Sequence, residues 1–192
     1  MQLINIAEIQ SGYISRGKIE PHDDGSHFLL QAKDVDADNL TYRSDDIIRF
    51  HANLSRKDWL LESGDVLFMA RGVRNYSILL NEVPGNVLAA ACFFIIRVSS
   101  KRVLPEYLFW YLNQDPVAHY LQQQSGRGVH MPIVRRSVLE NIPIPVPPLD
   151  IQDRVAKLNG LMRREAELIN KLAEKRRKII IAACLQTVQA NL

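Results

Sequence analysis

The sequence has few of the residues that build catalytic or metal centres. It contains only two cysteines, and neither has a Cys or His neighbour at metal-ligand spacing. We therefore expect Cys92 and Cys184 to be buried apolar side chains in a reducing compartment. No phosphate-binding glycine loop, H-E-x-x-H helix or G-x-S-x-G turn occurs. The sequence predicts no catalytic residue, no metal site and no cofactor of its own.

Long hydrophobic runs are also absent. The longest uncharged apolar stretch, residues 83–96, is too short to span a bilayer and is interrupted by Pro84, Gly85 and Asn86. The first residues lack the basic and apolar regions of a signal peptide. We therefore expect a cytoplasmic protein without a membrane span.

The five histidines form no helical i, i+4 pair. His22 and His27 lie on either side of a turn that contains Asp23 and Asp24. Acidic turns of this kind are usually solvated. We interpret this segment as a solvated turn, and a metal site there is the less favoured alternative.

Positive charge is not concentrated in the N-terminal half. Residues 1–96 contain nine Lys and Arg against 13 Asp and Glu, residues 97–148 contain six against three, and residues 149–192 contain nine against five. A nucleic-acid-binding domain normally has a basic face. Any contact with nucleic acid must therefore use local clusters, or rely on a partner to neutralise phosphates.

The pattern of apolar residues predicts an α+β protein, with a mixed α/β domain over residues 1–148. Strands are expected at 28–31, 66–70, 76–80 and 91–98, because short apolar runs lie there between turn residues. Pro105 at a first helical position predicts a helix over 105–112. A second short helix is expected after Asp115 as its N-cap.

Four prolines within residues 143–148 exclude regular helix and interior strand, and a long proline-free segment follows. Residues 149–192 form a second unit, predicted to be a helix over about 150–189. Its heptad rows are apolar except at Glu165, Arg176 and Gln186. The predicted dimerisation residues are Ile151, Val155, Leu158, Met162, Ile169, Leu172 and Ile179. We expect a coiled coil with a helix of a second chain, and the alternative is a helix that packs on its own N-terminal domain.

Three stretches resemble the specificity subunits of type I restriction-modification systems. Residues 60–72 are similar to the family's L-x-x-G-D strand, and residues 121–133 contain a matching Ser-Gly and Met-Pro-Ile. Residues 139–155 resemble the family's L-x-x-I-P-I-P-x-P-P-L-x-x-Q-x-x-I signature closely, and residues 6–12 match the usual start of the domain.

The resemblance implies a target recognition domain followed by a spacer helix, as in one half of a tandem specificity subunit. Such a subunit reads double-stranded DNA, whereas a partner methyltransferase subunit carries out the chemistry with S-adenosylmethionine. A restriction subunit with motor and nuclease activity is a further implied partner. In this family, two recognition domains at a fixed distance read a bipartite site. The resemblance therefore implies that a half-subunit acts as a homodimer, with its long helices paired as an antiparallel coiled coil.

Base reading in DNA uses Arg for guanine and Asn or Gln for adenine. The candidate DNA-binding residues form three clusters: Arg71, Arg74, Asn75 and Tyr76; Gln31 and Lys33; and Arg127 and His130. The alternative for each is an exposed loop charge, and for Tyr76 it is a core position. The rival function is a dimeric scaffold that binds protein and not DNA, which the acidic N-terminal half favours.

Overall fold

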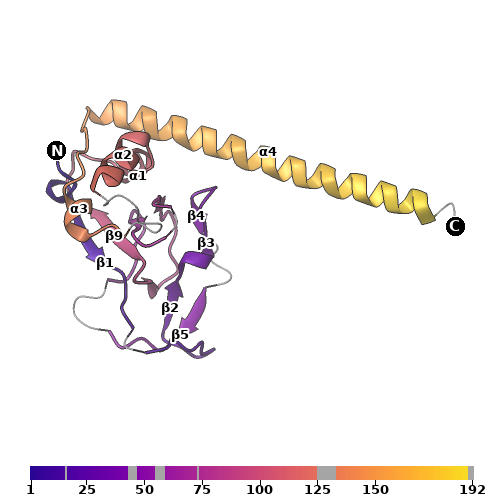
Figure 1. Cartoon of the computed structure of the whole chain (residues 1–192), viewed down its shortest axis with the longest axis horizontal. Coiled ribbons are helices and arrows are strands. Elements are labelled where there is room, and N and C mark those ends of the chain that lie inside the picture. The colour runs from indigo at the N-terminus through magenta and orange to yellow at the C-terminus, as the bar shows by residue number, and fades with distance from the viewer. Residues whose placement is uncertain (16, 43–46, 55–58, 73, 125–132, 190–192) are drawn as a thin grey trace. The chain divides into compact units, whose positions relative to one another are not determined.

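The computed structural model describes residues 1–15, 17–42, 47–54, 59–72, 74–124 and 133–189. The chain divides into two compact units, residues 1–155 and 156–192. Helix α4 (Leu149–Gln189) is continuous through this boundary (Figure 1). The first residues of the helix, 149–155, therefore belong to the same unit as the domain that precedes them.

The first unit contains a four-stranded antiparallel sheet. Its strand order is β1 (Ala7–Ser11), β9 (Phe93–Val98), β6 (Val66–Met69) and β7 (Ser77–Leu79). All four side chains of β6 are buried, because Val66 and Phe68 belong to one hydrophobic cluster whereas Leu67 and Met69 belong to another. The sheet is thus covered on both faces, which explains why β6 is a continuous apolar run instead of an alternating one.

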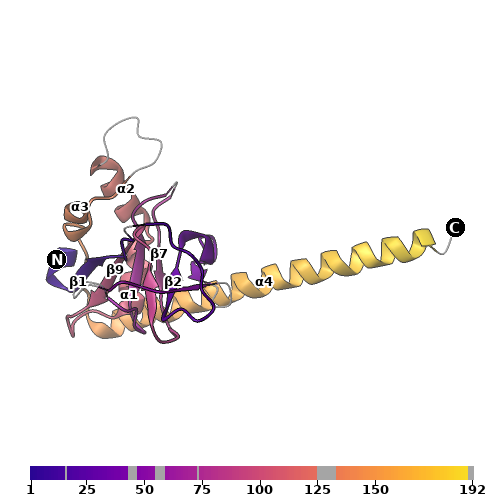
Figure 2. The same cartoon turned by 90° about the horizontal axis from the view of Figure 1, so that it is seen from below.

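Helices cover the first face of this sheet (Figure 2). The covering elements are η1 (Leu3–Asn5), α1 (Pro105–Leu112), α2 (Asp115–Gln124) and α3 (Arg136–Glu140). From α1, Tyr107, Leu108 and Leu112 are buried in this cluster. Pro105 occupies the first turn of α1 as expected. α2 begins at Asp115 itself, so that residue is helical and not the cap.

A second sheet lies on the other face of the first. It has the order β5 (Ile48–Phe50), β2 (His27–Leu30), β8 (Val87–Ala89), with β2 parallel to β8 and antiparallel to β5. The short elements η2 (Ala32–Asp34), β3 (Val35–Asp36) and β4 (Thr41–Tyr42) follow β2. The α+β class and the strands at 28–31, 66–70, 76–80 and 91–98 are confirmed to within a few residues.

One cysteine prediction is wrong. Cys184 is exposed on α4, and Cys92 is only half-buried. Cys184 lies one position after Ala183 of the heptad row that contains Val155, Met162 and Ile169, so it is outside the predicted helix interface. Among the described residues, no helix combines the length and apolar character that crossing a membrane requires.

A buried ion pair holds the turn before β6. Asp65 is 1% exposed, and both its carboxylate oxygens accept hydrogen bonds of 2.8 Å from the Arg97 guanidinium on β9. Arg97 also donates to Glu62 at 2.9 Å, and its guanidinium lies 4.9 Å from the Trp59 ring centre. The hydrogen bond to Asp65 and the neighbouring carboxylates raise the pKa of Arg97 despite partial burial. The Gly-Asp pair of residues 64–65 therefore has a structural role.

The proline segment, residues 142–148, packs on the N-terminal domain. Ile142 and Ile144 are fully buried. The Leu3 nitrogen donates to the Ile142 oxygen at 3.0 Å, and the Ile144 nitrogen donates to the Met1 oxygen at 2.6 Å. Alternating apolar residues thus anchor the segment, while the prolines between them fix its extended backbone.

Gln152 fixes the first turn of α4 to the N-terminal domain. Its side chain is fully buried. The amide oxygen accepts from the Leu104 nitrogen at 2.9 Å, and the amide nitrogen donates to the oxygens of Arg102 at 2.8 Å and Pro147 at 2.7 Å. One side chain therefore satisfies three backbone groups, two of them in the segment before α1.

Candidate nucleic-acid interface

The loop that joins β6 to β7 carries the exposed cation Arg71. The backbone on both sides of this residue is held, because the Ala70 nitrogen donates to the Cys92 oxygen at 2.8 Å and the Val134 nitrogen donates to the Ala70 oxygen at 2.9 Å. Arg71 itself forms a β-bridge with Ile133. The guanidinium thus projects from a fixed backbone, which lowers the entropy lost when it binds a ligand.

Two further candidates in this loop stabilise the loop itself. The Asn75 side-chain amide donates to the Met69 oxygen at 2.8 Å. Arg74 donates to the Ala37 oxygen, forms a 3.3 Å ion pair with Asp38, and is 57% exposed. Asn75 therefore fixes the conformation of the loop. Arg74 must break its ion pair with Asp38 before it can contact a phosphate or a base of DNA.

Tyr76 has a different environment from its loop neighbours. It is 8% exposed and belongs to the hydrophobic cluster between the two sheets. Burial raises the pKa of its phenol, with a smaller effect from Cys92. The structure favours the core alternative for Tyr76, and we do not retain this residue as a DNA contact.

The second predicted cluster lies in η2. The Gln31 side chain caps this turn by accepting from the Asp34 nitrogen, and the Asp34 carboxylate accepts from the Gln31 nitrogen at 2.8 Å. Both polar groups are thereby used in a capping box. Lys33, between them in sequence, is exposed. Gln31 thus stabilises the turn, and Lys33 places an exposed positive charge on it.

Cys92 links these two clusters. Its backbone oxygen accepts from the nitrogen of Ala70, next to Arg71, at 2.8 Å, and the nitrogen of Ala90 donates to the oxygen of Leu30, next to Gln31, at 2.9 Å. Burial raises the pKa of the Cys92 thiol. Arg74 reaches Ala37 and so contacts the segment that follows η2. The segments that carry Lys33, Arg71 and Arg74 are therefore adjacent in the structure, and we call these three residues the Arg71 surface.

The third predicted cluster, Arg127 and His130, lies outside the described residues. The chain re-enters the described region at Ile133, which pairs with Arg71. The role of Arg127 and His130 in DNA binding stays a prediction.

Comparison with known proteins identifies this domain. Residues 2–175 match the family model described as type I restriction modification DNA specificity domain. The chain belongs to this family. The match covers the N-terminal domain, the proline segment and the first two-thirds of α4.

Individual specificity subunits are similar to this chain at low identity. The type I restriction enzyme MjaVIII specificity subunit of Methanocaldococcus jannaschii is 24% identical over 137 residues, which is 68% of this chain and 31% of that protein. The crystal structure of the HsdS subunit from Thermoanaerobacter tengcongensis matches with a TM-score of 0.64 at 22% identity, covering 88% of this chain and 43% of that one.

A third match is a chain from a structure described as the structural basis underlying complex assembly and conformational transition of the type I R-M system. Its TM-score is 0.66 at 24% identity, over 93% of this chain and 45% of that chain. This chain therefore spans less than half the length of the specificity subunits that it matches. Its fold is one α+β domain followed by one long helix.

Within this specificity-domain family member, α4 exposes most of its predicted dimerisation residues. Val155 packs on the N-terminal domain and Ile151 is 39% exposed. The other five, which are 49–68% exposed, are Leu158, Met162, Ile169, Leu172 and Ile179. A row of large apolar side chains is thus open to solvent in the single chain, as required for pairing with another helix.

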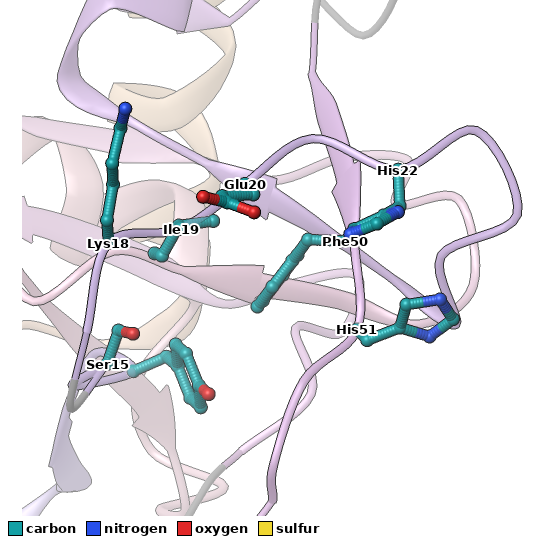
Figure 3. A pocket seen from close by; sticks show the side chains of 8 residues that line it. Ser15, Lys18, Ile19, Glu20, His22, Phe50 and His51 are labelled. Atoms are coloured by element: carbon teal, nitrogen blue, oxygen red, sulfur yellow. The ribbon is translucent and has the colours of Figure 1, made fainter.

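The sequence did not indicate a pocket of about 210 Å³ that lies between the segment after β1 and the end of β5 (Figure 3). Its lining residues are Tyr13, Ser15, Lys18, Ile19, Glu20, His22, Phe50 and His51. They come from the segment after β1 and from the end of β5. The two segments share no local sequence motif, because β2 lies between them in the chain.

Proposed function

We propose that this chain is the sequence-reading part of a type I restriction-modification methyltransferase complex, and that it reads one half of a bipartite DNA site. The observation that carries the proposal is the Arg71 surface, where adjacent segments of a DNA specificity domain carry exposed cations. The chain contributes no chemistry. The methyl transfer belongs to a partner methyltransferase subunit that binds S-adenosylmethionine.

Within this proposal, Arg71 reads a base and Lys33 contacts a phosphate. A guanidinium forms bidentate hydrogen bonds to guanine in the major groove, whereas an ammonium acts as a point charge. Asn75 and Gln31 contribute indirectly, because their amides fix the backbones that carry Arg71 and Lys33. Asp38 pairs with Arg74 and reduces the positive charge of this side. Affinity therefore depends on phosphate contacts from the methyltransferase subunit.

The second half of the bipartite site requires a second recognition domain. We propose that it comes from another copy of this chain through antiparallel pairing of the α4 helices. The exposed apolar row on α4 supports this pairing, since a lone surface helix does not leave so many large apolar residues in water. The assembled complex is expected to be cytoplasmic, and a restriction subunit would add to it.

Arg71→Ala is expected to relax or abolish sequence discrimination without unfolding the domain. Loss of one bidentate base contact costs about 1–3 kcal/mol of discrimination, or roughly 5- to 150-fold. Competitive DNA binding by the complex with its methyltransferase subunit measures this change. Arg102→Ala removes the same charge from an exposed position before α1 and is the matched control. Equal discrimination by the Arg71 and Arg102 variants would exclude the Arg71 surface.

Replacing Leu158 and Leu172 together by glutamate is expected to convert a dimer into a monomer. Two charges buried in the helix interface cost several kcal/mol because they have no partners there. Sedimentation velocity of the full chain measures the mass. Gly160→Glu with Asn170→Glu adds the same charge on the outer heptad positions and should leave the dimer intact. A dimer that persists in the leucine variant contradicts pairing through this face.

A further inference from the structure

His22 and Asp24, from one turn, lie close to His51, which follows β5. Figure 3 shows the two histidines at the pocket that they help to line. The ligand atoms of His22, Asp24 and His51 all lie within 4.8 Å of one another. The two imidazole ring centres are 5.2 Å apart, and the His51 Nε2 lies 3.6 Å from the Asp24 Oδ1. His27, the histidine that the sequence paired with His22, instead contacts Ser26 through its Nδ1.

The backbone holds the turn of residues 22–25 against β5. The His22 nitrogen donates to the Arg49 oxygen at 2.8 Å, and the Gly25 nitrogen donates to the His22 oxygen at 3.0 Å. A Cβ atom on Gly25 would lie 2.4 Å from the Phe50 nitrogen, a distance that no side chain tolerates. Glycine therefore allows the turn to sit directly on the strand, and this contact places His22 and Asp24 opposite His51.

The ligand set matches borderline transition-metal ions. Zinc binds imidazole nitrogen and carboxylate oxygen at about 2.0–2.2 Å, whereas calcium and magnesium prefer sites made of oxygen. All three side chains are exposed, so small side-chain rotations can bring their ligand atoms together around an ion. The Arg49 guanidinium donates to the backbone oxygen of Asp23 at 2.9 Å and lies 5.4 Å from the Phe28 ring centre, so it also helps to hold the 22–25 turn on β5.

We propose that His22, Asp24 and His51 bind a divalent transition-metal ion, with Zn²⁺ as the reference ion. Three protein ligands leave a fourth position for water, and two of them, His22 and His51, also line the pocket. The bound ion links the 22–25 turn to His51, the residue that follows β5. By joining these two segments it stabilises this part of the specificity domain.

The test is titration of the untagged full chain with Zn²⁺ by calorimetry, together with absorption spectra of the Co²⁺ form. The expected result is one site per chain, visible Co²⁺ bands typical of nitrogen and oxygen ligands, and a Zn²⁺-dependent rise in Tm. His22→Ala, Asp24→Asn and His51→Ala should each weaken Zn²⁺ binding about tenfold or more, since even loss of a residue that only supports a ligand costs 10- to 100-fold.

His119→Ala is the matched control, because His119 is an exposed histidine on α2 outside this group. It should bind Zn²⁺ like the unaltered chain. Circular dichroism of each apo variant shows whether the fold is kept, and the exposure of the three side chains predicts that it is. The proposal is overturned if the unaltered chain shows no saturable Zn²⁺ site with a dissociation constant below about 100 µM. That limit is far weaker than the binding of Zn²⁺ to protein zinc sites. Equal weakening by His119→Ala and His51→Ala would also overturn it.

Discussion

Asp65→Ala is expected to lower the free energy of unfolding by about 3–5 kcal/mol, enough to unfold part of the population at 37 °C. Removing this carboxylate leaves the Arg97 guanidinium without its two shortest hydrogen bonds at a position only 30% exposed. The Glu62 nitrogen also loses its acceptor, because it donates to the Asp65 carboxylate at 2.8 Å. The hydrogen bonds of Asp65 that join the turn before β6 to Arg97 on β9 are then lost.

Urea denaturation followed by circular dichroism measures this loss. Glu62→Ala is the matched control, since Glu62 pairs with the same guanidinium but its side chain is 65% exposed. An exposed ion pair contributes about 0–1 kcal/mol, so the control should unfold close to the unaltered chain. Similar midpoints for the two variants would show that the Asp65–Arg97 pair does not hold the β6 turn.

Gln152→Leu is expected to destabilise the N-terminal unit by about 3 kcal/mol or more. The leucine has a similar volume but leaves the Leu104 nitrogen and the oxygens of Arg102 and Pro147 without their partner. Each buried backbone group that loses its hydrogen bond costs about 1–3 kcal/mol, and the Gln152 side chain is fully buried. The first turn of α4 should separate from the segment before α1.

Hydrogen exchange at the amides of Leu104 and residues 149–155 measures this separation, and thermal unfolding measures the total loss. Arg154→Leu is the matched control. Its side chain is 73% exposed, its ion pair with Asp150 is 3.7 Å long, and arginine and leucine have similar helix propensities. Equal protection of Leu104 in both variants would contradict the role assigned to Gln152.

Local sequence features determine most of the elements that were predicted. The apolar run at 66–69 lies between turn residues, and Pro105 begins α1, so their bounds follow from neighbouring residues alone. The strands β5 and β8 have three residues each and pair with β2 across long intervals. β7 is equally short but pairs with β6, the strand directly before it, whereas β5 and β8 depend on a partner that is distant in sequence and gives no local signal.

The candidate site was predictable in residue type but not in role. Arg71 and Lys33 are exposed, as a contact to DNA requires, whereas the amides of Asn75 and Gln31 bond to nearby backbone. Side chains that cap turns and side chains that read bases belong to the same polar types, so sequence alone does not separate them. His51 lies far from His22 in sequence, and only the pairing of β5 with β2 brings the two together.

Methylation-site sequencing tests the central claim most directly. DNA is isolated from cells that lack other modification systems and express this chain with its methyltransferase subunit. The unaltered chain and Arg102→Ala should produce one recurring bipartite sequence with a methylated base, and Arg71→Ala should produce fewer or more varied sites. The claim is contradicted if the two proteins do not form a complex, or if replacing Lys33, Arg71 and Arg74 together by alanine leaves the methylated sequence unchanged.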